Sequence, residues 1–254
     1  MFNQLEIHML TFKRPLHFLA TIFTLRLMLG THANNIKFKI LSQNVSNIKF
    51  LFAKLLFRDV QIIQKKDNVG MLAGWQELQL NISRPIIMLL EDDWASIIPN
   101  KKKLLLALST MYEGNADFIK LRIIKDFDDY GFGNPLVSPW TSKKSNILSY
   151  NTDSNYYKSN NHSVAFTFNP CLVRADLYKE LLKDLVNDTN DETPLRSGEN
   201  QVIIKWRKLK KITVYQLKIG CFTHIGFHSR RDYLVRMPRL IWILATGVHK
   251  WKKF

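Results

Sequence analysis

Cysteine is scarce in this 254-residue chain, which contains only Cys171 and Cys221. Two cysteines so far apart form neither a disulfide framework nor a zinc ribbon, so we expect a reducing compartment. Hydrophobic residues make up 46% of the chain and charged residues 23%, which are ordinary values for a globular protein. That composition excludes an intrinsically disordered chain, a collagen and a coiled coil. The length suits one large domain or two small ones.

Long hydrophobic runs are also missing. The longest, residues 18–29 and 240–248, are too short or are interrupted by Arg26, whereas a helix needs about 20 apolar residues to cross a bilayer. Residues 1–10 have no basic segment ahead of an apolar one, which argues against a signal peptide. We therefore expect a cytoplasmic protein that attaches at most to a membrane surface.

Acidic residues are in deficit. The chain has 37 Lys and Arg against 21 Asp and Glu, for a net charge of +16 and a pI near 9.8. Residues 1–60 and residues 226–254 each carry +6, so most of the excess lies near the two ends. Such an excess predicts an anionic partner, which is nucleic acid, anionic lipid or a phosphorylated small molecule.

The C-terminal tail, residues 226–254, combines its basic residues with aromatic ones. Trp242, Trp251 and several aliphatic residues are interleaved with Arg and Lys. This composition is typical of a helix that lies on an anionic membrane surface. A helix that packs on the main domain with a solvated basic face has the same composition. We expect a helical tail and favour the membrane surface as its partner.

The spacing of apolar residues predicts the order of strands and helices. Up to residue 95, the predicted strands cover 6–11, 36–41, 60–64 and 85–90, and the predicted helices cover 16–29, 47–57 and 69–80. This alternation favours an α/β fold with a mostly parallel sheet and helices on both faces. Further along, the pattern predicts helices at 101–112, 175–186 and 198–208 and strands at 118–124, 163–168 and 212–223. The polar stretch 125–162 is too long for a simple connection and suggests a functional lid.

The triplet Glu91-Asp92-Asp93 directly follows the apolar strand at 85–90. In an open α/β sheet, ligands bind beyond the carboxyl ends of the strands. Three adjacent carboxylates repel one another unless a cation or hydrogen-bond donors lie nearby. Mg²⁺ and Mn²⁺ take oxygen ligands and bridge carboxylates to substrate phosphates, so the triplet is a candidate metal–diphosphate site. The alternative is a solvated acidic turn that caps the strand.

Four short motifs lie at the ends of the predicted strands. They are Thr11-Phe12-Lys13-Arg14-Pro15, Gln43-Asn44-Val45-Ser46, Asn68-Val69-Gly70 and Glu91-Asp92-Asp93. In this order they resemble the motifs of the GT-A nucleotide-sugar glycosyltransferases, particularly the broad family-2 type. The matching family features are a Ser/Thr-aromatic-x-Arg-Pro strand end, a turn that holds the nucleobase, an Asn-x-Gly helix start and an acid-x-acid metal motif. Gln43 replaces an acid that often contacts uracil, so the motif does not identify the nucleotide.

The resemblance covers residues 5–95 well and residues 115–225 loosely. It implies a GT-A domain at 1–225, with a nucleotide-binding half at 1–95 and an acceptor half at 96–225. It also implies a metal-dependent hexosyltransferase that uses Mn²⁺ or Mg²⁺ to move a sugar from a nucleotide-sugar donor to a glycan or lipid-linked acceptor hydroxyl. Carried onto this chain, the nucleotide-binding residues are Thr11, Phe12, Arg14, Asn44, Asn68, Gly70, Glu91 and Asp92, and Asp93 is the principal metal ligand.

A late histidine and a further acid complete the expected site. Some GT-A enzymes supply a late His to the metal, and His224 follows the last predicted strand; a histidine hydrogen-bonded at a strand end is the alternative. Inverting members of the family often use the Asp of a Glu-Asp pair as the base, and the nearest match here is Glu199-Asn200. Glu199 is therefore either the catalytic base or an acid that stabilises a helix N-terminus. The reserve candidates for the base are Asp126, Asp128 and Asp129.

Two other functions fit parts of the sequence. A sugar-1-phosphate nucleotidyltransferase usually has a Gly-rich phosphate loop after its first strand, but residues 12–15 contain no glycine. The pI alone suggests a non-enzymatic nucleic-acid binder, but the sequence has no recognisable binding module and no basic cluster on one motif. We therefore expect no nucleic-acid partner.

Overall fold

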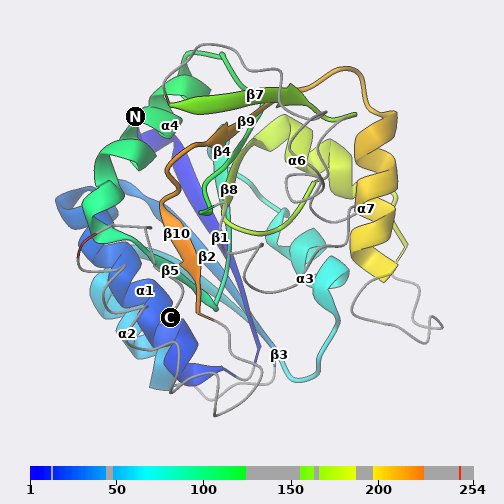
Figure 1. Ribbon diagram of the computed structural model, residues 1–254. Helices are drawn as coiled ribbons and strands as arrows, with labels where there is room; N and C mark the ends of the chain where they lie inside the picture. The colour runs from blue at the N-terminus through cyan, green and yellow to red at the C-terminus, as the bar shows by residue number, and fades with distance from the viewer. Residues whose placement is uncertain are drawn as a thin grey trace, which may run out of the picture.

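The computed structural model describes residues 1–12, 14–43, 48–123, 155–162, 166–186, 197–225 and 246. In them a large sheet lies between two layers of helices, which confirms the predicted α/β fold (Figure 1). The C-terminal tail lies outside the described residues except for Thr246. The helical tail, and the boundary at residue 225, therefore stay predictions.

Within the described residues, the main sheet has eight strands in the order β3-β2-β1-β4-β8-β6-β9-β7. Their bounds are β1 Leu5–Phe12, β2 Lys37–Gln43, β3 Asp59–Lys65, β4 Ile86–Glu91, β6 Phe118–Lys120, β7 Tyr156–Asn160, β8 Cys171–Arg174 and β9 Thr213–Leu217. β1 pairs in parallel with β2 and β4, whereas β8 runs antiparallel to β4 and β6. A second, antiparallel pair consists of β5 (Trp94–Ser96) and β10 (Phe222–His224).

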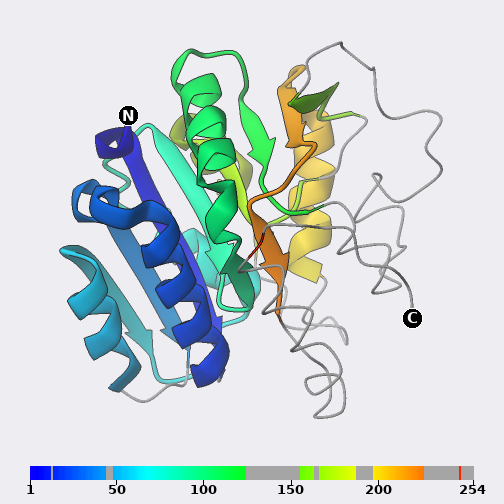
Figure 2. The same ribbon diagram turned by 60° about the vertical axis from the view of Figure 1, so that its left-hand side comes forward.

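Helices cover both faces of the main sheet (Figure 2). On one face lie α1 (Pro15–Leu29), α2 (Ile48–Leu56) and α4 (Lys101–Tyr112), and on the other lie α3 (Met71–Leu78), α6 (Ala175–Leu182) and α7 (Ser197–Lys208). Short 3-10 helices cover Phe2–Gln4, Gly30–Asn35 and Ile98–Asn100. Each helical layer buries its own apolar cluster against the sheet, for example Phe18 of α1 on the first face and Trp75 of α3 on the second.

The first half of the chain folds as its local pattern predicts. The residues of β4 from Ile86 to Leu90 are all buried, in agreement with an apolar run covered on both faces. α1 begins at Pro15, where the missing N–H of proline costs little. It ends at Leu29, and the capping residue Gly30 has a φ of 58°, a backbone conformation that favours glycine. Because β1 pairs in parallel with β2 and β4, the carboxyl ends of the three strands lie together at one edge of the sheet.

In the second half, two predicted strands are wrong. Residues 166–168 are not a strand, and Phe166 and Phe168 pack as core rings against Trp206 and Trp75; the strand is β8, a few residues later, because those residues pair with β4 and β6. The single strand predicted at 212–223 is two strands, β9 and β10, which belong to different sheets. The chain crosses between them at Gly220, where a Cβ atom would clash with the backbone carbonyl of Arg122.

Two further predictions need correction or stay open. The strand predicted at 118–124 ends at Lys120, as β6. The end of the polar stretch 125–162 contains β7, an edge strand that pairs antiparallel with β9. Residues 124–154 lie outside the described residues, so the predicted lid remains a prediction.

A buried charge network joins β1, β2 and the segment before β4. Glu6 is 0% exposed, and its carboxylate accepts hydrogen bonds from His8 Nε2 at 2.9 Å and from the backbone N and Oγ of Ser83 at 3.0 Å each. Lys39 Nζ lies 3.0 Å from the same carboxylate and donates to the carbonyl oxygens of Leu80 and Asn81. Burial opposes ionisation of Glu6, but these hydrogen bonds together hold the pKa of its carboxyl group well below the usual range.

Among the described residues, no helix has both the length and the hydropathy needed to span a bilayer.

Candidate functional site

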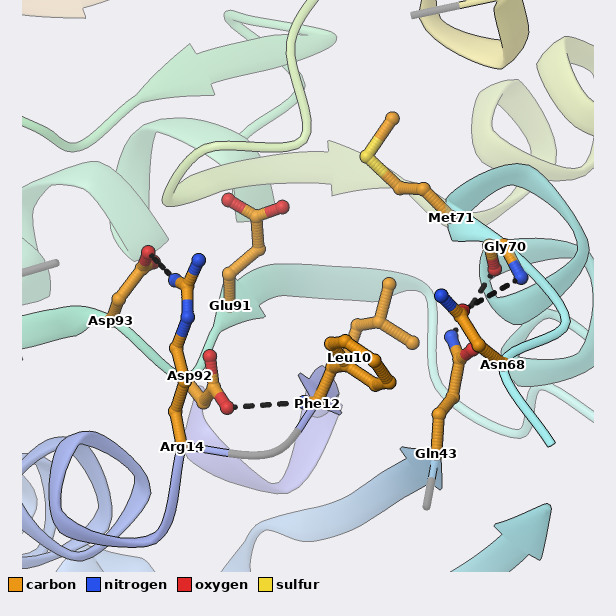
Figure 3. Close-up of a pocket in the computed structure, with 10 residues that line it drawn as sticks. All are labelled: Leu10, Phe12, Arg14, Gln43, Asn68, Gly70, Met71, Glu91, Asp92 and Asp93. Atoms are coloured by element: carbon orange, nitrogen blue, oxygen red, sulfur yellow. Dashed lines mark hydrogen bonds and ion pairs between the residues drawn. The ribbon is translucent and has the colours of Figure 1, made fainter. Parts of the chain in front are cut away.

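A pocket of about 300 Å³ opens at the carboxyl ends of β1, β2 and β4, where an open α/β sheet binds its ligands (Figure 3). It is lined by Leu10, Phe12, Arg14, Gln43, Asn68, Gly70, Met71, Glu91, Asp92 and Asp93. In Figure 3 the three acids and Arg14 lie on one side, and Gln43, Asn68 and Gly70 lie on the other. All four motifs singled out in the sequence therefore contribute to one pocket, the second of them through Gln43 alone.

Asp92 links the end of β4 to β1. Its Oδ2 atom accepts hydrogen bonds from Thr11 Oγ1 at 2.6 Å and from the backbone N of Phe12 at 3.2 Å. The backbone oxygen of Asp92 accepts a third bond, from Thr21 Oγ1 of α1 at 2.7 Å. Burial, together with the charge of Asp93, raises the pKa of Asp92 to about 7 although Thr11 and Arg14 oppose the shift. Thr11 and Asp92, both predicted to bind the nucleotide, thus also hold β1 and β4 together.

Asp93 lies on the charged side of the pocket, beside Arg14 (Figure 3). Its Oδ2 atom forms an ion pair with Arg14 Nη1 and lies 3.2 Å from Nε2 of His224. Burial opposes ionisation of Asp93, but His224 and Arg14 hold the pKa of its carboxyl group below the usual range. The second oxygen, Oδ1, is buried and accepts no hydrogen bond from the described residues. The carboxylate of Asp93 thus has one oxygen that no hydrogen-bond donor among the described residues satisfies.

His224 reaches Asp93 through the small β5–β10 sheet. In that sheet His224 pairs with Trp94, and the two rings meet edge to face with centroids 5.0 Å apart. The backbone N of Ile225 donates to the backbone oxygen of Asp93 at 2.7 Å. The two residues predicted from the sequence as metal ligands are thus brought together, although they are 131 positions apart in the chain.

The opposite side of the pocket is a loop tied to β2. The side-chain amide of Gln43 accepts from the backbone N of Val69 at 2.8 Å and donates to the oxygen of Gly70 at 3.2 Å. Asn68 Oδ1 accepts from the backbone N of Gly70 at 3.0 Å, and Gly70 takes a φ of 84° at the start of α3. Gln43 therefore fixes the shape of the predicted Asn-x-Gly motif.

The sequence patterns do not identify His17, which the charge of Asp93 reaches, or two buried basic residues of the sheet, Lys120 and Arg122. His17 follows Arg14 by one helical turn; burial lowers the pKa of its imidazole, against the opposing charge of Asp93. Lys120 and Arg122 are only 1% and 2% exposed; burial raises the pKa of the Cys171 thiol, as the charge of Glu91 does, whereas Lys120 and Arg122 oppose that shift. For Lys120 and Arg122, the available signal is the alternation of basic and apolar residues in the apolar run FIKLRII at residues 118–124.

Other predicted site residues are not placed by the structure. Asn44 lies outside the described residues, as do Asp126, Asp128 and Asp129. Glu199 lies in the first turn of α7, with its side chain undescribed. In the part of the chain that is described, no three His, Cys, Asp or Glu side chains gather to hold a metal ion. A metal bound at Asp93 and His224 would therefore need further ligands from elsewhere.

No protein-family model and no curated protein matches this chain. Solved structures do resemble it. A structure of S. aureus TarS 1–349 has a TM-score of 0.56 at 14% identity, over 98% of this chain and 67% of that one. The mannosyltransferase PcManGT from Pyrobaculum calidifontis, in complex with GDP-Man and Mn²⁺, has a TM-score of 0.57 at 8% identity, over 99% and 66%. TarS 1–349 in complex with UDP-GlcNAc has a TM-score of 0.55 at 11% identity, over 98% and 68%.

These likenesses confirm that the chain has the fold of GT-A nucleotide-sugar glycosyltransferases, as the order of its motifs predicts. The chain spans about two thirds of the chains just described, and 40% of a longer TarS chain. At these identities the likeness concerns the fold, and the activity has to be argued from the residues of the pocket.

Proposed function

We propose that the protein is a glycosyltransferase that moves a hexose from a nucleotide-sugar donor to a hydroxyl group of a glycan or lipid-linked acceptor. The observation that carries this proposal is the pocket in which Asp93 and Arg14 face the loop at residues 68–70 across the strand ends. Two structures of the same fold contain such donors, GDP-Man in PcManGT and UDP-GlcNAc in TarS 1–349. A pocket of about 300 Å³ holds only part of such a donor. The rest of the donor would extend toward solvent, where an acceptor could reach it.

The donor would lie between the two sides of the pocket. The side chain of Arg14 is half-exposed, and its guanidinium forms an ion pair with Asp93 at the rim of the pocket. From there the guanidinium could contact the diphosphate of a bound donor. The start of α3 at Gly70 faces the same space, and backbone N–H groups at a helix start favour negatively charged ligands. Thr11, Phe12, Asn68, Glu91 and Asp92 would line the nucleoside and sugar.

The residues present fit the Mn²⁺ or Mg²⁺ that we propose as cofactor. Asp93 Oδ1 is buried without a hydrogen-bond donor among the described residues, which is the state expected of an oxygen that takes a cation. Asp93 and His224 would hold the ion, with oxygens of the donor completing its ligands. When bound, the metal would supply positive charge that stabilises the departing nucleoside diphosphate. Arg14, which neutralises Asp93 here, would turn to the same phosphates.

An acid would deprotonate the acceptor hydroxyl as it attacks the anomeric carbon. We propose Glu199 of α7 for this role, with Asp126 as the reserve, because any carboxylate within hydrogen-bond reach of the acceptor can serve. We also propose that the protein is cytoplasmic and attaches peripherally to a membrane, where a lipid-linked acceptor would be found.

The test measures donor binding and hydrolysis with a panel that includes UDP-GlcNAc and GDP-Man, with and without Mn²⁺. Asp93→Asn removes a negative charge from the proposed metal site at nearly constant volume, so we expect binding of one donor to fall by at least about tenfold. The matched control is Asp176→Asn on α6, whose side chain is 71% exposed and which should bind as the wild type does. A protein that binds no nucleotide sugar, or binds one regardless of both Mn²⁺ and Asp93, would refute the proposal.

A further inference from the structure

The helices on the two faces of the sheet differ in charge. α1, α2 and α4, which Figure 2 shows as one layer, contain six basic residues and no acidic one. On the other face, α3, α6 and α7 contain four basic and four acidic residues and are balanced. The first layer therefore carries a net positive charge, and a positively charged surface attracts anions.

The same layer exposes large hydrophobic side chains. Of the thirteen that are exposed among the described residues, six lie on α1 and α2, each between 47% and 72% exposed: Leu16, Phe23, Leu27, Leu51, Phe52 and Leu55. On α1 they recur at helical spacing, which gathers them into a stripe opposite the buried face that holds Phe18 and Ile22. Single exposed hydrophobic residues are normal, but a contiguous set on two adjacent helices marks an interaction surface.

The two helices present these side chains in the same direction. α1 and α2 lie side by side on one face of the sheet, and their inner rings, Phe18 and Phe50, contact each other edge to face. Their outer surfaces therefore point away from the sheet together. Lys54 is exposed among the apolar residues of α2, and Arg58 is exposed just beyond its end. We call the outer surface of α1 and α2, with these basic residues, the α1–α2 face.

We propose that the α1–α2 face binds the surface of an anionic membrane. Phe and Leu side chains would enter the boundary between headgroups and acyl chains, while the basic residues would contact the negatively charged headgroups. A nucleic acid would meet the charges but would leave the apolar stripe exposed. A second copy of the chain would bury the stripe, but it would bring two positively charged faces together, and that repulsion opposes association.

Such binding would also orient the proposed active site. α1 begins directly after Arg14, which lines the pocket, and Leu16 of the apolar stripe lies only two residues further on. The stripe therefore starts at the rim of the pocket, where Phe12 is also exposed. This proposal rests on the peripheral membrane attachment proposed above and names the surface that would make it, whereas binding to vesicles does not require transferase activity. If the proposed function is correct, the membrane would bring a lipid-linked acceptor to the mouth of the pocket.

The test is co-sedimentation of the full chain with vesicles of phosphatidylcholine that contain 30% phosphatidylglycerol, and with vesicles of phosphatidylcholine alone. We expect the wild type to bind the anionic vesicles. The variant Phe23→Ser/Leu27→Ser/Leu51→Ser/Leu55→Ser should bind them at least about tenfold more weakly. The matched control, Leu80→Ser/Ile204→Ser, changes two equally exposed residues on the other side of the sheet and should bind like the wild type.

Two further measurements distinguish binding by the α1–α2 face from misfolding of the four-serine variant and from binding by the C-terminal tail. Because the four substituted side chains are exposed, the variant should keep the far-UV circular dichroism and melting temperature of the wild type; its own donor binding should also persist. A variant with the tail arginines Arg230, Arg231, Arg236 and Arg239 changed to serine tests the predicted tail separately. Unchanged vesicle binding by the four-serine variant would overturn the proposal. So would a dimer in sedimentation equilibrium that the four substitutions dissociate without any loss of vesicle binding.

Discussion

Replacing Glu6 by Gln tests the buried charge network between β1 and β2. The substitution keeps the size of the side chain but leaves the ammonium group of Lys39, which is 1% exposed, without its carboxylate partner. Removing one partner of a buried ion pair costs about 3–5 kcal/mol. Lys39 keeps its hydrogen bonds to Leu80 and Asn81, and a Gln oxygen still accepts from Ser83, so we expect a loss near 3 kcal/mol.

The assay is urea unfolding followed by tryptophan fluorescence, with thermal melting as a second measure. For a chain of this size, a loss near 3 kcal/mol corresponds to a fall of about 6–12 °C in the melting temperature. The double variant Glu6→Gln/Lys39→Met removes both charges, and it should recover at least half of the lost stability. A loss below about 1 kcal/mol for Glu6→Gln, or a double variant less stable than the single one, would refute this account.

The pH dependence of the same variant has a defined sign. The pKa of Glu6 is lower in the folded protein than its ordinary value of 4.5, so the ionised carboxylate stabilises the fold above pH 4.5. That stabilisation is lost as the pH falls through the folded pKa. The difference in stability between wild type and Glu6→Gln should therefore stay constant from pH 7 to pH 5 and shrink below pH 4.5.

Three other substitutions probe the pocket and its supports. Thr11→Val removes the 2.6 Å hydrogen bond to buried Asp92 and should lower the free energy of unfolding by about 1–2 kcal/mol in urea titrations, whereas an unchanged value would contradict the anchoring role of Asp92. Gln43→Ala removes two hydrogen bonds of a buried side chain, so it should lower the melting temperature by several degrees and weaken binding of the donor by about tenfold in calorimetry; equal affinity would mean that the loop at residues 68–70 holds its shape without Gln43. Gly220→Ala places a Cβ against the backbone of Arg122 and should lower the melting temperature by several degrees, which a wild-type melting curve would rule out.

The sequence predicts well those parts of the fold that depend on local spacing. Strands and helices up to β4 follow from the alternation of apolar residues, from Pro15 at the start of α1 and from Gly30 at its end. β8 was missed because it is four residues long and its position depends on pairing with β4 and β6. The crossing at Gly220 was missed because the apolar alternation runs through it almost unbroken, and only the backbone of Arg122 requires the glycine.

The site was predictable to the extent that it consists of strand ends. Three motifs placed Arg14, Asn68 and Asp93 around one pocket, because the carboxyl ends of parallel strands share an edge. The partners within the pocket were not predictable, since Thr11 meets Asp92 across 81 positions and His224 meets Asp93 across 131. His224 was singled out by resemblance to a family, and its contact depends on the pairing of β5 with β10.

Because β10 pairs with β5, the pocket is completed late in the synthesis of the protein. Synthesis delivers β1 to β4 first, and these strands pair with one another, but one edge of β4 stays open until residues 171–174 leave the ribosome. The ring that completes the Asp93 site arrives later still, with the β10 strand near residue 224. The nascent chain therefore holds the acidic half of its pocket, without the histidine, while the 131 positions between Asp93 and His224 are being synthesised. If Asp93 and His224 together hold the proposed metal, that metal can bind only after β10 has docked on β5.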